Sequence, residues 1–127
     1  MEQVGDKAVA RNYRDLLVWQ NGIKLAKAIY MLAERFPKHE MYALGDQIRR
    51  AAVSVPSNIA EGQARKAPAD FRRFLHHALG SLAEIDTQLV LAYEFGYLGK
   101  NDIGAVDSQI QALRMKLYAL MNSLPNR

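Results

Sequence analysis

Apolar residues recur at intervals of three and four along most of this chain, a spacing typical of amphipathic helices. The first such stretch runs from about Asp15 to Phe36. Asp15 can accept hydrogen bonds from the free amides of a first turn and is the predicted N-cap, and Pro37 is expected to stop the helix. The apolar positions of this first helix are Leu16, Trp19, Ile23, Ala26, Tyr30 and Ala33.

A second helix is predicted from about Tyr42 to Ala64, with Pro56 inside it. Proline has no backbone N–H, and its ring crowds the carbonyl four residues earlier. We therefore expect either a kink at Pro56 or a break into two shorter helices. The apolar positions of this second helix are Leu44, Ile48, Ala51, Val55, Ile59 and Gly62.

A third helix is predicted from about Pro68 to Phe95, because Pro68 suits a first turn and Gly96 suits a C-terminal stop. From Phe71 to Gly96, fourteen of 26 residues are apolar or aromatic, whereas a helix that buries one face needs about three in seven. The surplus indicates a partner surface, and homo-oligomerisation is our first explanation. The alternative is an ordinary scatter of apolar residues over the surface.

A fourth helix is predicted to start at Asn101 or Asp102 and to end near Leu124. No stretch of useful length alternates in the manner of a strand, and the connections between helices are short. Consecutive helices are then expected to be antiparallel, so the predicted fold is an all-α, antiparallel up-down-up-down four-helix bundle. Residues 13–127 are predicted to form this single domain, preceded by a flexible N-terminal tail over residues 1–12.

The composition excludes several functional classes. The chain has 127 residues and no cysteine, which excludes disulfides, cysteine-ligated zinc, iron–sulfur clusters and a cysteine nucleophile. No apolar run approaches the roughly 18 residues that indicate a membrane span, and the polar start lacks the apolar segment of a signal peptide. We therefore expect a cytoplasmic protein without a membrane partner and without a cofactor.

The formal net charge of +4 is concentrated in residues 49–73. This segment holds six basic and two acidic residues, whereas the two signs balance over the rest of the chain. Such a segment is typical of a surface that binds polyanions, and equally of a solvated helical face. In the first interpretation the phosphate contacts are Arg49, Arg50, Arg65, Lys66, Arg72 and Arg73.

Polar residues also recur at intervals of three and four on the second and third helices. If these helices are antiparallel neighbours, the two polar stripes meet in a belt whose groups hydrogen-bond to one another. Such a belt would fix the helix register or a subunit contact, and the alternative is that both stripes face water. Gly80, within the third helix, is small enough for another backbone to approach closely. The predicted belt residues are Ser54, Asn58, Glu61, Ser81 and Glu84.

Arg72 and His77 have a spacing that resembles the Arg-x4-His signature of HEPN ribonucleases. In that interpretation His77 moves protons and Arg72 holds phosphate. The alternative is a pair of exposed basic side chains near the start of a helix. A di-metal carboxylate site needs a Glu-x-x-His pair on each of two helices, and no such pair occurs, so we expect no metal site.

Three segments carry a family resemblance. Ala43–Ala52 has the sequence ALGDQIRRAA, Ser54–Gly62 has SVPSNIAEG, and Ala78–Glu84 has ALGSLAE. Together they closely resemble the four-helix-bundle protein family associated with intervening sequences in 23S ribosomal RNA genes, from about Asp15 to Leu124. The resemblance implies an antiparallel four-helix bundle and, as in some members, a ring-like homopentamer. It implies no established enzymatic activity.

The family is similar to the accessory variability determinant of diversity-generating retroelements, a strongly basic pentamer that binds nucleic acid and a reverse transcriptase. This chain is less basic than those relatives. It also departs from the family at Ala67, where a serine usually precedes the third helix, so we expect that helix to lack its cap. We expect a non-enzymatic homo-oligomer, most simply a homopentamer, with moderate affinity for RNA or DNA. A pure protein–protein interaction module is the alternative, and a ribonuclease is the third hypothesis.

Overall fold

The computed structural model describes residues 12–126, and over this range the protein is helical without any strand. Two short 3-10 helices, η2 (Tyr13–Asp15) and η3 (Lys38–Glu40), precede the first and second α-helices. The predicted tail lies outside the described residues, except for Asn12. The long helices are α1 (Leu17–Ala33), α2 (Leu44–Ala64), α3 (Pro68–Glu94) and α4 (Lys100–Ser123).

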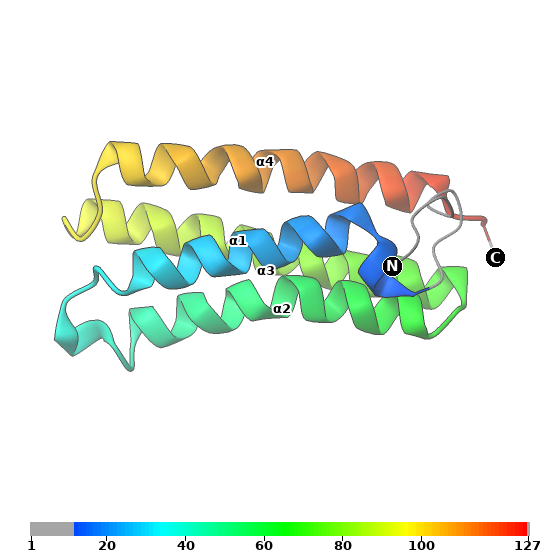
Figure 1. The fold of residues 1–127 in the computed structure, drawn as a ribbon, viewed down its shortest axis with the longest axis horizontal. Coiled ribbons are helices and arrows are strands. Elements are labelled where there is room, and N and C mark those ends of the chain that lie inside the picture. The colour runs from blue at the N-terminus through cyan, green and yellow to red at the C-terminus, as the bar shows by residue number, and fades with distance from the viewer. Residues whose placement is uncertain (1–11, 127) are drawn as a thin grey trace.

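The four α-helices form a bundle in which each helix contacts two neighbours (Figure 1). α1 contacts α2, α2 contacts α3, α3 contacts α4, and α4 contacts α1, whereas the diagonal pairs α1–α3 and α2–α4 do not come close. In Figure 1 the chain runs to the left along α1, returns along α2, and repeats this course along α3 and α4. The predicted all-α four-helix bundle is therefore confirmed.

The core lies along the centre of the bundle and receives an apolar face from each α-helix. These faces follow the spacing seen in the sequence: Leu82, Ile85 and Leu89 of α3 are at most 1% exposed. None of the described helices is both long enough and apolar enough to cross a membrane. The largest fully enclosed side chains are Leu25, Ile29, Ile48, Val55, Ile59, Leu75, Leu82, Ile85, Leu89, Ile110, Leu113 and Leu117.

The start of α1 differs from the prediction, because Asp15 does not cap it. Asp15 ends η2, and Leu16 occupies the N-cap of α1 without a side-chain hydrogen bond to the helix. The side-chain cap lies earlier, where Asn12 Oδ1 accepts a hydrogen bond from the backbone N–H of Arg14 at 2.8 Å. Asparagine is as good a cap as aspartate, so the first helical turn forms upstream of the predicted position. At its other end, α1 stops at Ala33, three residues earlier than predicted.

α2 is one helix that continues through Pro56, so the alternative of two shorter helices is wrong. The Pro56 ring is buried against α1 at Gly22, where an added Cβ would lie 3.4 Å from the Cβ of Pro56. Gly22 leaves room for the ring, and burial of the ring offsets the missing backbone hydrogen bond.

The first turn of α2 is held by a residue that precedes it. α2 begins at Leu44, two residues later than predicted, and its N–H donates a hydrogen bond to Glu40 Oε1 at 3.2 Å. The Tyr97 hydroxyl donates to Glu40 Oε2 at 2.7 Å. The Tyr97 hydrogen bond, followed by that from Leu44, lowers the pKa of Glu40. Glu40 therefore ties the start of α2 to the connection between α3 and α4.

α3 ends at Glu94, two residues before Gly96, which the sequence predicts as the C-terminal stop. Gly96 has a positive φ of 81°, a conformation that glycine adopts at little cost. The N–H of Tyr97 donates to the carbonyl of Ala92 at 2.8 Å, and the N–H of Gly96 donates to that of Tyr93 at 3.0 Å. This pair of hydrogen bonds is the Schellman motif, which stops the helix.

α4 begins at Lys100, slightly before the predicted start at Asn101 or Asp102. Gly99 is the N-cap residue, and its N–H donates to Asp102 Oδ2 at 2.9 Å. Asp102 also forms an ion pair with Arg35, just beyond the end of α1. The backbone hydrogen bond from Gly99, followed by that from Arg35, lowers the pKa of Asp102. The carboxylate predicted to begin the helix instead closes its first turn and links α4 to α1.

The missing cap of α3 gives a stability prediction. Ala67 occupies the N-cap with an extended backbone (φ −119°, ψ 127°) and no side-chain hydrogen bond. A serine there can accept a hydrogen bond from a first-turn amide, so Ala67→Ser is expected to raise the free energy of unfolding by about 1 kcal/mol. Urea denaturation measures the change. Ala105→Ser, at an exposed site inside α4, is the control and should give no gain. Equal stability of Ala67→Ser and the wild type would contradict the missing cap.

Candidate functional site

The candidate site lies along the seam between α2 and α3. The two helices approach closely near their connection, because Gly62 of α2 has no side chain. A Cβ at Gly62 would lie 2.7 Å from the Cβ of Phe74 and 3.1 Å from Cδ1 of Phe71. This contact fixes the register of the two helices and therefore decides which polar residues meet.

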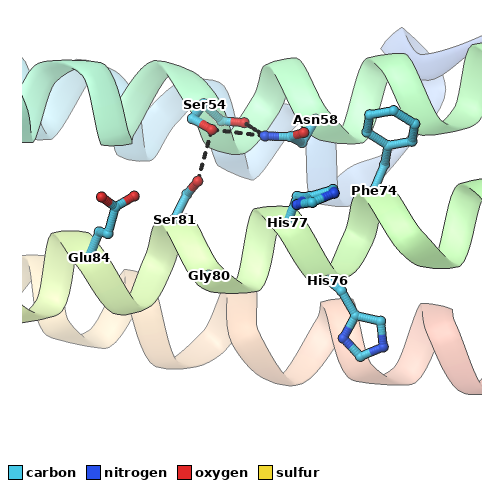
Figure 2. Close-up of a pocket in the computed structure, with 8 residues that line it drawn as sticks. All are labelled: Ser54, Asn58, Phe74, His76, His77, Gly80, Ser81 and Glu84. Atoms are coloured by element: carbon cyan, nitrogen blue, oxygen red, sulfur yellow. Dashed lines mark hydrogen bonds between the residues drawn. The ribbon is translucent and has the colours of Figure 1, made fainter.

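Three of the five predicted belt residues form one connected set of hydrogen bonds at this seam (Figure 2). The Ser81 hydroxyl on α3 donates to Ser54 Oγ on α2 at 2.8 Å. Asn58 Nδ2 donates to the Oγ and to the backbone carbonyl of Ser54, both at 2.8 Å. Glu61 instead forms an ion pair with Arg65 on its own helix, at 3.1 Å. The polar stripes therefore meet at their centre, whereas Glu61 does not take part in this set of hydrogen bonds.

A groove runs along the outside of the seam. It consists of two adjoining cavities of about 490 and 230 Å³, and Ser54 and Glu84 line both. In Figure 2 the Glu84 carboxylate points from α3 toward α2, His77 lies between the helices near Phe74, and His76 points away. The larger cavity is lined by Ser54, Asn58, Phe74, His76, His77, Gly80, Ser81 and Glu84. The smaller is lined by Gln47, Arg50, Ala51, Ser54, Glu84 and Gln88.

Gly80 lines this groove and has open space where a Cβ would lie. No heavy atom of residues 12–126 comes within 4 Å of the position that its Cβ would take, its own helix backbone and chain neighbours aside. A glycine inside a helix costs about 1 kcal/mol relative to alanine. The close approach of another backbone, expected at Gly80 from the sequence, is therefore made by Gly62 within the described chain and not by Gly80.

Gln88 is a polar residue of the groove that continues the stripe on α3 but is not one of the five predicted belt residues. Its side chain is 7% exposed, and Oε1 is enclosed without a hydrogen-bond partner among the described residues. A buried polar atom without a partner costs about 1–3 kcal/mol. The signal in the sequence is its spacing of four from Glu84, which places both residues on one face of α3.

The predicted phosphate contacts separate into two groups, and one of them is organised around an aromatic ring. Arg73 Cζ lies 4.5 Å and Arg65 Cζ lies 5.0 Å from the centroid of Phe74. The two guanidinium groups are therefore at most about 10 Å apart, each within the range of a cation–π contact. Arg65 pairs with Glu61, and Arg73 pairs with Asp70 at 3.4 Å. From its place in the apolar spacing of the third helix, Phe74 is expected only in the core, so the sequence does not reveal this role.

Lys66 and Arg72 complete the group at this end of the bundle, which we call the basic end (Arg65, Lys66, Arg72 and Arg73). Lys66 is exposed in the α2–α3 connection and has a positive φ of 61°. Arg72 Nη2 donates to the carbonyls of Leu124 and Pro125, at 3.1 and 2.9 Å. Arg72 thus ties α3 to the end of α4, a structural contact that leaves its other N–H groups for a ligand.

Arg49 and Arg50 lie far from the basic end. They precede Arg65 by about fifteen residues on α2, which corresponds to roughly 22 Å along a helix. Arg49 Nη2 donates to the carbonyl of Met41 at 2.8 Å, and Arg50 pairs with Asp46 at 3.2 Å. The structure therefore brings together four of the six predicted phosphate contacts and separates these two from them.

The residues of the ribonuclease hypothesis do not converge. The Arg72 guanidinium bonds to the end of α4, whereas His77 lies in the groove between α2 and α3. In the part of the chain that the structure describes, no group of three or more histidine, aspartate and glutamate side chains could hold a metal ion.

Comparison with known proteins places this geometry in context. The sequence profile of the family described as 23S rRNA-intervening sequence protein matches residues 14–119. The structure is similar to that of a protein of unknown function from the S23 ribosomal protein family of Bacteroides thetaiotaomicron, with a TM-score of 0.77 and 20% sequence identity. The similarity covers 84% of this chain and 100% of that chain, and at this identity it concerns the fold alone. No curated protein matches the sequence.

Proposed function

This chain belongs to the 23S rRNA-intervening sequence protein family, and from that premise we propose that it is a non-enzymatic, oligomeric four-helix bundle that binds RNA or DNA phosphates with moderate affinity. The basic end of α2 and α3 is the proposed contact surface. The observation that carries the proposal is the pair of arginines, Arg65 and Arg73, held over one Phe74 ring.

The Phe74 ring supports phosphate binding by ordering the two guanidinium groups. A guanidinium that stacks on an aromatic face keeps its N–H groups along its edge, where they can meet phosphate oxygens. Both arginines already pair with carboxylates, from Glu61 and Asp70, and a phosphate must compete with them. Exposed ion pairs contribute only about 0–1 kcal/mol each, so competition lowers the affinity without preventing binding. Moderate, salt-dependent affinity follows.

The proposal of a binding role without catalysis is supported by the positions of Arg72 and His77, the pair suggested by the ribonuclease hypothesis. Two of the contacts made by Arg72 are to backbone carbonyls at the end of α4. His77 lies in the α2–α3 groove, so the two side chains face different parts of the bundle. These positions favour a binding surface over a ribonuclease site.

Homo-oligomerisation is supported by exposed apolar side chains on more than one face. Ile23 and Tyr30, spaced by seven residues, share one face of α1, and Val90 and Tyr93 line a groove between α3 and α4. Two different patches on neighbouring copies can meet and close a ring. We propose that the ring is a homopentamer and that each chain is an antiparallel up-down-up-down bundle. The exposed large apolar residues are Leu17, Ile23, Tyr30, Met31, Met41, Tyr42, Val53, Val90, Leu91, Tyr93, Phe95, Met115 and Tyr118.

The assembly has a direct test. Size-exclusion chromatography with light scattering is expected to give five times the chain mass of 14.3 kDa, about 70 kDa. Ile23→Glu is expected to reduce this mass, because it places a charge in an apolar patch, whereas Gln109→Glu, which adds the same charge at an exposed position of α4, should not. A wild-type monomer at micromolar concentration would contradict the ring.

A pure protein–protein module is the second candidate, and the unpartnered Gly80 beside a polar groove favours it. Purification from cells with and without nuclease treatment separates the two functions. Nucleic-acid binding predicts a bound nucleic acid that nuclease removes, whereas a protein module predicts partners that copurify equally with and without nuclease.

A further inference from the structure

The part of the α2–α3 groove farthest from the basic end is not used by the proposed function. It is the smaller cavity, of about 230 Å³, and it lies around Glu84 and Gln88 on α3. Gln47, Arg50 and Ser54 of α2 form the facing wall. Within the described chain, Gln88 is enclosed but its Oε1 has no hydrogen-bond partner.

The charge of this cavity is opposite to that of the whole chain. Glu84 forms no ion pair or hydrogen bond with any residue from 12 to 126, and its carboxylate points from α3 toward α2 (Figure 2). The one cation in the lining, Arg50, is paired with Asp46 on its own helix at 3.2 Å. The unneutralised charge in the cavity is therefore negative, although the chain carries +4 overall. A cation is the complementary ligand.

Glu84 and Gln88 together offer acceptors to one planar ligand. Their spacing of four residues places their Cβ atoms about 5–6 Å apart on the same helix face. The final torsion of a glutamine side chain is roughly two-fold, so a half turn exchanges its amide N and O and can present Oε1 to the groove. Carboxylate and amide oxygens would then face the same space.

We propose that this cavity binds a guanidinium group. A guanidinium carries five N–H donors in one plane, so it can form a bidentate pair with the Glu84 carboxylate and reach Gln88 Oε1 with a remaining N–H. An ammonium group is a compact, more strongly hydrated charge and matches this planar set of acceptors less well. Occupation gives the Glu84 carboxylate a counter-charge and gives Gln88 Oε1, once turned toward the groove, a hydrogen-bond donor. The site goes beyond the proposed phosphate surface and does not depend on it.

Two kinds of ligand carry this guanidinium group. One is an arginine side chain presented by a partner protein, and the other is a free small molecule such as arginine. Gly80 lies one helical turn from Glu84 and leaves the groove open beside it. An arginine presented on a helix can therefore approach without meeting a side chain at Gly80. The two sources share the same contacts at Glu84 and Gln88.

Titration of the full-length, isotope-labelled protein with capped arginine, followed by NMR, tests the site. The side-chain amide signals of Gln88 and the backbone amides around Glu84 are expected to shift and to saturate. Capped citrulline, the neutral analogue, should leave these signals unchanged. Glu84→Gln is expected to weaken binding about tenfold or more, because it removes the charge-assisted pair. Glu61→Gln, which alters an exposed carboxylate already paired with Arg65, is the matched control and should bind like the wild type.

Two further arms separate the sources and complete the test. Tighter binding of a helical peptide with one central arginine than of capped arginine would assign the site to a partner protein. Tighter binding of capped arginine would assign it to a small molecule. Gln88→Met keeps the side-chain volume and is expected to lose binding while the protein stays folded. Equal shifts with citrulline, or wild-type binding by both Glu84→Gln and Gln88→Met, would overturn the proposal.

Discussion

Replacing Gly62 with alanine is expected to lower the free energy of unfolding by about 1–3 kcal/mol, whereas the same replacement at Gly80 is expected to raise it by about 0.5–1 kcal/mol. Both glycines lie inside long helices, so alanine adds the same helix propensity at each. The difference comes from their surroundings. At Gly62 the new Cβ would lie 2.7 Å from the Cβ of Phe74, but at Gly80 it meets no heavy atom within 4 Å.

The loss at Gly62 arises because its neighbours cannot withdraw. The nearest atoms are the Cβ of Phe74 and, at 3.1 and 3.3 Å, the ring and backbone carbonyl of Phe71. A Cβ and a backbone carbonyl move only with their helix, so α3 must shift away from α2 and from the shared core. This overpacking outweighs the gain of about 1 kcal/mol in helix propensity.

Chemical denaturation of the two variants measures these changes. Opposite signs are the expected result, with the wild type between the variants. A destabilised Gly80→Ala variant would show that Gly80 is packed against something in the assembled protein. A Gly62→Ala variant as stable as the wild type would contradict the close approach of α2 and α3.

The double replacement Arg65→Gln and Arg73→Gln is expected to weaken RNA binding about tenfold or more at low salt. Each arginine accounts for one phosphate contact, so the slope of log Kd against log salt should also fall by about two. Fluorescence polarisation with a labelled RNA hairpin gives both quantities. Glutamine keeps a hydrogen-bonding side chain without the charge, which isolates the electrostatic contribution.

The matched control removes the same charge elsewhere. Lys24→Gln with Lys27→Gln neutralises two exposed lysines of α1, which is not part of the basic end. This pair is expected to change Kd and its salt slope much less. Equal losses for the two double variants would mean that overall charge, and not the surface around Phe74, attracts RNA.

The fold was largely predictable because its helices bury their stripes at regular intervals. The spacing of Leu82, Ile85 and Leu89 places all three in the core, as expected for an amphipathic helix. What the spacing did not predict concerns the capping of α1 and the course of α2 at its proline. The N-cap of α1 is Leu16 and not Asp15, and the nearby side-chain cap, Asn12, belongs to η2. The spacing also left open whether Pro56 breaks α2, and the helix continues through it. Spacing alone does not rank two capping residues or show the room that a neighbouring helix leaves for a ring.

The candidate site was predictable only in part, for reasons of distance along the chain. The stripe spacing placed Ser54 and Ser81 in one belt, and the register of α2 and α3 brings these two hydroxyls together. It did not predict that Arg72 binds the carbonyl of Leu124, 52 residues away. It also did not predict the two arginines on Phe74. Such contacts depend on where helix ends meet, which periodicity does not specify.

The salt dependence of RNA binding by the wild-type protein tests the central claim most directly. At about 50 mM salt, fluorescence polarisation should detect binding to a structured RNA. Log Kd should then rise linearly with log salt, with a slope of about 0.9 for each phosphate contact on a duplex. Four basic residues at one end of each chain predict a slope of roughly three or more. The absence of binding at low salt to structured RNA and to duplex DNA, or an affinity that salt does not change, would contradict it.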